Sequence, residues 1–102
     1  MTPQEAEAFL RRYKAYDWLI HDIRPMWTTS DLLEAIQRAG ILPSASRKLI
    51  NGWCEGKLSN GDRALPGAVN YKSTLGWRIP REDLLVFFAE GRAEKMASSA
   101  VS

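Results

Sequence analysis

The chain has 102 residues, of which 45% are hydrophobic and 25% are charged, so it can build one modest core and is not intrinsically disordered. Its single cysteine and single histidine exclude an internal disulfide and a metal cluster built from Cys or His ligands. No stretch of about 18 apolar residues occurs, and the acidic N-terminal segment lacks the apolar run of a signal peptide. We therefore expect one domain in a reducing, cytoplasmic setting, without a membrane span.

The net charge of +2 is distributed unevenly along the chain. Residues 1–23 carry a net charge of −1, residues 24–81 a net charge of +5, and residues 82–102 a net charge of −2. A basic segment between acidic flanks is typical of a surface that meets a polyanion, although it also fits a solvated face.

The first predicted helix covers residues 3–22. Thr2 can cap it, Pro3 suits the first helical position and Glu5 completes a capping box. A stripe at spacings of three and four is expected to be mostly buried: Ala6, Phe9, Leu10, Tyr13, Asp17 and Ile20. The helix ends before Pro25, because the residue that precedes a proline avoids the α region. We interpret residues 1–23 as an accessory N-terminal helix.

Two short helices are predicted next, joined by a tight turn. The first begins near Thr28 to Asp31, which offer several capping side chains, and ends at Gly40. The second begins after Ser44 or Ser46 and extends towards Leu58, with Gly56 closing it. Its expected inward residues are Leu49, Ile50, Trp53 and Cys54. Two helices joined in this way form a helix-turn-helix arrangement.

A β-hairpin is predicted from the alternating pattern that follows. One strand lies near residues 68–72 and the other near 76–79, with Ser73 and Thr74 at the tip. Pro80 then begins a helix with a strongly apolar face, which Gly91 ends. Residues 24–91 are thus predicted to form the main domain, and residues 92–102 a flexible tail.

Three segments resemble a known group of proteins. The run Gly76-Trp77-Arg78-Ile79-Pro80-Arg81-Glu82-Asp83-Leu84 looks like the wing-to-helix junction of excisionase-like and MerR-like DNA-binding domains. The run Trp53-Cys54-Glu55-Gly56-Lys57-Leu58 is similar to the end of their recognition helix, and residues 28–40 resemble their first helix. The resemblance covers about residues 27–88. The stretch between Leu58 and Trp77 is longer than the usual wing, which leaves either an elongated hairpin or an added loop.

The resemblance implies a mainly α fold with a small β-hairpin: a winged helix-turn-helix with an extra N-terminal helix. It also implies binding of double-stranded DNA, most closely as an excisionase, or recombination directionality factor, which bends DNA and directs an integrase towards excision. A small transcriptional regulator and a phage terminase small subunit use similar domains and remain open. A dimer or a cooperative array on DNA is expected, because one small domain reads few base pairs. The alternative of another class is a protein-interaction module on the same fold.

The expected DNA contacts come from the second helix and the hairpin. Arg47 suits a guanine edge, Asn51 can pair with adenine, Lys48 suits a phosphate, and Gly52 allows a close approach of the backbone. The full predicted set is Ser46, Arg47, Lys48, Asn51, Gly52, Lys57, Arg63, Asn70, Tyr71, Lys72, Ser73, Thr74 and Arg78. Arg24 and Arg38 are further candidates for flanking phosphates.

An enzymatic role has no support in the sequence. Residues 52–61 do not match a phosphate-binding loop, and one histidine cannot supply a catalytic set by itself. We therefore expect a protein that is not an enzyme and carries no cofactor or metal. Trp53, Trp77 and Cys54 are interpreted as packing residues, and Trp18 and Trp27 as a seal between the N-terminal helix and the domain.

Overall fold

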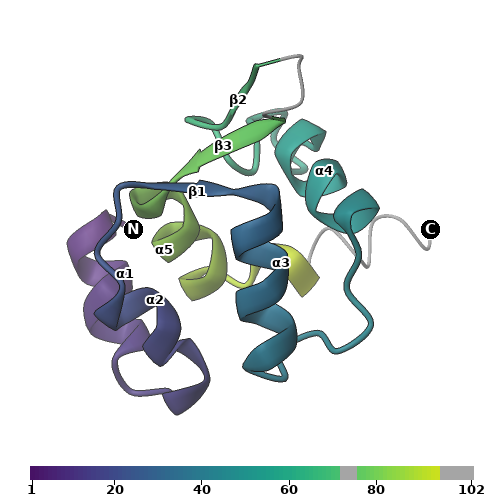
Figure 1. Ribbon diagram of the computed structural model, residues 1–102. Coiled ribbons are helices and arrows are strands. Elements are labelled where there is room, and N and C mark those ends of the chain that lie inside the picture. Colours follow the sequence, from purple (N-terminus) through teal and green to yellow (C-terminus); the bar gives the residue numbers. More distant parts are fainter. Residues whose placement is uncertain (72–75, 95–102) are drawn as a thin grey trace.

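The computed structural model describes residues 1–71 and 76–94 of the chain (Figure 1). Its elements, in chain order, are α1 (Pro3–Leu10), the 3-10 helix η1 (Lys14–Tyr16), α2 (Asp17–His21), β1 (Met26–Thr28), α3 (Thr29–Arg38), α4 (Arg47–Glu55), β2 (Val69–Asn70), β3 (Trp77–Pro80) and α5 (Arg81–Ala89). The fold is mainly α with a small antiparallel sheet, as the sequence predicts. None of the helices in the described part has the length and apolar character that a bilayer span requires.

The sheet has the strand order β1-β3-β2, and both pairs are antiparallel. The hairpin of β2 and β3 is the predicted one, with Val69 opposite Arg78 and Asn70 opposite Trp77. The strand β1 is an addition that the sequence reading missed, and it places Trp27 opposite Ile79. Three residues are too few for an alternating pattern to be recognised, so only the pairing with β3 defines this strand.

One hydrophobic core joins all the helices to the inner face of the sheet. It includes Leu10 from α1, Leu32 from α3, Ile50 from α4 and Phe87 from α5, all of them fully buried. Trp18 contacts Trp27 edge to face with 5.4 Å between ring centroids, and it contacts Phe88 in the same way at 5.8 Å. These contacts confirm the expectation that Trp18 and Trp27 join the N-terminal segment to the rest of the domain.

The prediction of one continuous helix over residues 3–22 is wrong. The chain leaves the helix after Leu10, Tyr13 is extended, and α2 begins only at Asp17. Leu10 and Leu19 are both fully buried, but nine helical residues would place them about 180° apart on one helix. The break lets both side chains reach the same core, and it leaves Phe9 and Tyr13 on the surface, where their rings contact each other.

The long segment between α4 and β2 is a loop that packs on the core rather than an elongated hairpin. Lys57 and Arg63 form an isolated antiparallel bridge around the turn at Gly61. Beyond the turn, Ala64 and Leu65 are fully buried. The added loop therefore ends in core contacts, and the hairpin that follows it starts only at Val69.

Candidate nucleic-acid interface

The helix α4 lies at the edge of the molecule, on the side opposite to α1 and α2 (Figure 1). Ser46 caps it, since its hydroxyl accepts a hydrogen bond from the amide of Leu49. The buried face of the helix consists of Ile50, Trp53 and Cys54, and the Trp53 ring lies 4.9 Å from that of Phe87. This packing anchors one face of α4 and leaves the opposite face to solvent.

The centre of the outward face is formed by Lys48, Gly52 and Glu55. At about 100° per residue, these three positions lie within about 60° of one another and opposite the buried face, and all three are exposed. The expectation that Leu49 faces inward is wrong, because this side chain remains 37% exposed. Leu49 lies on the flank of the helix, where the core of this small domain does not extend.

Arg47 and Asn51 occupy the other flank, nearer to α3. The Arg47 guanidinium donates a hydrogen bond to the hydroxyl of Ser30, in the first turn of α3. Arg47 remains exposed, whereas Asn51 is half-buried. Ser30 thus orients Arg47, a positioning role that the sequence reading missed because the two residues lie 17 positions apart.

Arg63 has a different role from the predicted one. Its guanidinium donates hydrogen bonds to the carbonyls of Cys54, Pro66 and Ala68. The side chain joins the end of α4 to the loop before β2 and lies over the Trp77 ring at 5.9 Å. These contacts make Arg63 a structural residue of the loop rather than an outward cation.

The hairpin contributes further members of the predicted set. Arg78 and Val69 are paired on the neighbouring strands β3 and β2, on the face of the sheet opposite to buried Ile79. Asn70 and Tyr71 are exposed. Tyr71 continues the pairing, since its amide donates to the carbonyl of Gly76. Lys72, Ser73 and Thr74, which were predicted as the wing tip, lie outside the described residues.

The cations of the chain divide into two groups. Within the described residues, five arginines contact a carboxylate: Arg11, Arg24, Arg38, Arg81 and Arg92. Arg24 and Arg38, predicted as flanking phosphate contacts, are thus already paired, and both line an open groove between α2 and α3. Cations without an acidic partner in the same part of the chain are Arg47, Lys48, Lys57 and Arg78 on or next to α4 and β3, Arg63, whose donors go to backbone carbonyls, and Arg12 and Lys14 after α1.

Cys54 is buried, and its thiol is protonated at neutral pH. Burial raises the pKa of its thiol to about 12, so the thiolate does not form under ordinary conditions. Within residues 1–71 and 76–94, no group of His, Cys, Asp and Glu side chains could hold a metal ion.

Comparison with protein-family models, with curated proteins and with solved structures found no match to this chain.

Proposed function

We propose that this protein binds double-stranded DNA, with α4 as the helix that enters the major groove. The observation that carries the proposal is that Arg47 and Lys48 on α4, Lys57 just after it and Arg78 on the neighbouring β3 contact no carboxylate among the described residues. Cations that the fold does not use for its own ion pairs are available to phosphates. The half-buried amide of Asn51 adds a group that can hydrogen-bond to base edges or phosphates.

The order of elements supports a winged helix-turn-helix as the fold. The pair α3 and α4 is preceded by β1 and followed by the hairpin of β2 and β3, and the sheet packs beside the two helices (Figure 1). In this arrangement α4 is the recognition helix and the hairpin is the wing. The end of α4 and the start of α5 also carry the segments that resemble excisionase-like domains.

The narrower proposal is an excisionase that bends DNA and acts together with a site-specific integrase. A small transcriptional regulator or a terminase small subunit would use the same surface, so the three differ in partners rather than in the contact with DNA. Because α4 presents only a few outward side chains, one copy would read few base pairs. We therefore propose that dimers or cooperative arrays form on DNA.

The salt dependence of DNA affinity tests the proposal. Neutralising about four phosphates gives a slope of about −3.6 for log K against log salt, or a loss of about a hundredfold between 50 and 200 mM. Lys48→Ala should reduce the slope by about one. Lys14→Ala is the matched control, because it removes the same charge from an exposed position of η1, outside α4 and its neighbouring strands. Absence of binding to duplex DNA at low salt, or equal effects of the two variants, would overturn the proposal.

A protein-interaction role is the second candidate, and an exposed aromatic pair near the end of α1 favours it. Phe9 and Tyr13 are 36% and 47% exposed, and their ring centroids are 5.4 Å apart. Exposed aromatic pairs of this kind are common at protein interfaces. The double variant Phe9→Ser/Tyr13→Ser tests this role, and Lys48→Ala serves beside it as the test of DNA contact. If the double variant changes the oligomeric state or abolishes cooperative self-association, and Lys48→Ala leaves DNA affinity unchanged, the interaction role is the better account.

A further inference from the structure

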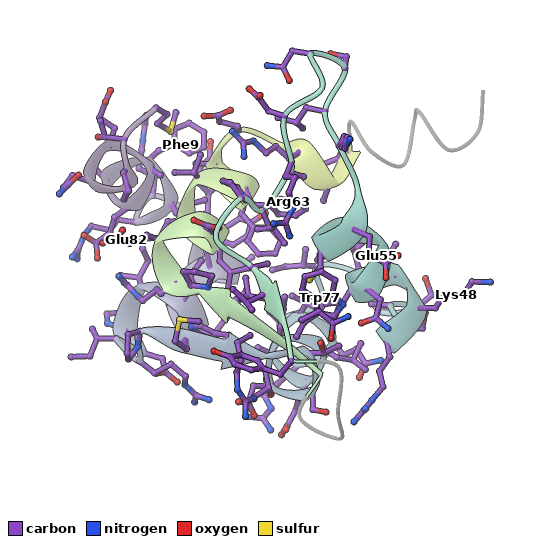
Figure 2. The ribbon with its side chains drawn as sticks, turned by 90° about the horizontal axis from the view of Figure 1, so that it is seen from above. Phe9, Lys48, Glu55, Arg63, Trp77 and Glu82 are labelled. Atoms are coloured by element: carbon purple, nitrogen blue, oxygen red, sulfur yellow. The ribbon has the colours of Figure 1, made fainter. Side chains whose placement is uncertain are left out.

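Glu55 is the acidic residue on the face that is proposed to meet DNA. It lies seven residues after Lys48, about 20° short of two full turns, so the two side chains share the centre of the outward face. Figure 2 shows both residues on α4, with Glu82 on the opposite side of the molecule. A carboxylate at the centre of a DNA-binding face requires a reason, because phosphates repel it.

The fold supplies no such reason for Glu55. Within the described residues its carboxylate accepts no hydrogen bond and forms no ion pair, and the arginine that lines the same hollow beside it, Arg63, gives donors to backbone carbonyls. Glu55 is also the last residue of α4, where the negative end of the helix dipole disfavours an anion. Its carboxylate therefore costs some stability where it stands.

The edges of the bases in the major groove offer a hydrogen-bond donor to this carboxylate, which the described part of the fold does not. The cytosine N4 amino group is a donor that a carboxylate accepts, and this pairing is a recognised route of direct readout. We propose that Glu55 is a specificity-determining residue that accepts a hydrogen bond from the N4 amino group of a cytosine. This inference rests on the proposed DNA-binding function and adds a base preference to it.

The geometry of α4 indicates where that cytosine lies. Lys48 and Glu55 are about 10 Å apart along the helix axis, which corresponds to about three base-pair steps of the duplex. Gly52 lies between them and has no side chain, and a Cβ built there would meet no atom within 4 Å. The backbone can thus come close to the groove, which lets a side chain as short as that of Glu55 reach a base edge.

Selection from a random duplex library tests the inference, with the full-length chain and no assumed operator. The wild-type protein should enrich cytosine at one position by about tenfold, which corresponds to the usual cost of a wrong base pair. Glu55→Gln should shift that position towards adenine, because the glutamine amide pairs with the N6 and N7 atoms of adenine. Glu55→Ala should remove the preference at that position alone.

Glu82→Gln is the matched control, because it removes the same charge from an exposed position in the first turn of α5. It should leave the selected sequence unchanged. Unchanged base preferences in Glu55→Gln, or the same change in both variants, would overturn the inference while leaving DNA binding established. No enrichment by the wild-type protein, together with no binding at low salt, would overturn the inference and the proposed function at once.

Thermal unfolding of the same variants provides a readout that does not depend on DNA. Since Glu55 lies at the unfavourable end of the helix dipole, Glu55→Gln should unfold at the wild-type temperature or above it. A lower midpoint would show that Glu55 serves the fold, and it would overturn the inference.

Discussion

Gly52→Ala should stabilise the protein and weaken the binding to DNA that is proposed for α4. Gly52 lies inside α4 with ordinary helical geometry, and a Cβ at this position would have no atom within 4 Å. Glycine in a helix interior costs about 0.8–1 kcal/mol relative to alanine. The variant should therefore gain about 1 kcal/mol in the free energy of unfolding, or about 4 °C or more in the thermal midpoint of a domain of this size.

DNA affinity should move in the opposite direction. Gly52 lies at the centre of the outward face of α4, where the methyl group would separate the helix from the floor of the groove. A separation that removes one or two direct contacts lowers the affinity about tenfold, which corresponds to about 1.4 kcal/mol. The assay is titration of a fluorescent duplex at fixed salt, with urea unfolding of the same sample.

Ala8→Gly is the matched control, since it makes the reverse exchange at an exposed position of α1, far from α4 (Figure 1). It should lose about 1 kcal/mol of stability and leave DNA affinity unchanged. A Gly52→Ala variant that is more stable and binds DNA as tightly as the wild type would refute the assignment of α4 as the groove-reading helix. A less stable variant would refute the geometry of the helix itself.

Three further predictions concern buried or partly buried side chains. Arg81 donates to carboxyl-end carbonyls of α2 and to Glu7, so Arg81→Ala should cost about 3 kcal/mol in urea unfolding, and a loss below about 0.5 kcal/mol would contradict this role. Burial raises the pKa of Asp83, against the opposing hydrogen bond from the Gly67 amide. The folded state therefore holds this proton more tightly than the unfolded state, and the stability that Asp83 contributes falls as the pH rises above about 4. The urea midpoint of Asp83→Asn relative to wild type should thus increase between pH 4 and pH 7, and a constant difference would contradict the assignment. Cys54 should react with a thiol reagent only as fast as the protein unfolds, and rapid reaction of the native protein at neutral pH would show that its thiol is accessible.

Local chemistry in the sequence was sufficient for the ends of several helices. Thr2, Thr28 and Ser46 cap α1, α3 and α4, because each hydroxyl lies three residues before the amide that it accepts from. Gly40 follows α3 with a φ of 75°, as expected of a glycine at a helix end. These interactions span only a few residues, so the sequence determines them without reference to the rest of the fold.

Tertiary packing decided the features that no local pattern contains. The stripe of residues 3–22 is compatible with one long helix, and the chain breaks only because Leu10 and Leu19 must reach the same core. Arg63 was predicted as an outward cation, but its three carbonyl partners come together only when the loop folds against α4. In the sequence, Glu55 is not distinguished from other residues of its helix. Only the folded chain shows that its carboxylate has no partner among the described residues.

In the candidate site, too, some features follow from the sequence and others only from the tertiary structure. The buried stripe of Ile50, Trp53 and Cys54 was readable from spacing alone, and with it the outward direction of Lys48, because both follow from the period of a helix. Which cations remain available was readable only in part: Arg38 pairs with Glu34 one turn earlier on α3, as spacing alone would suggest, but Arg81 meets Glu7 only because the fold brings α1 to α5. The sequence thus determined which face of α4 is turned to solvent, and the tertiary structure decided which charges surround that face.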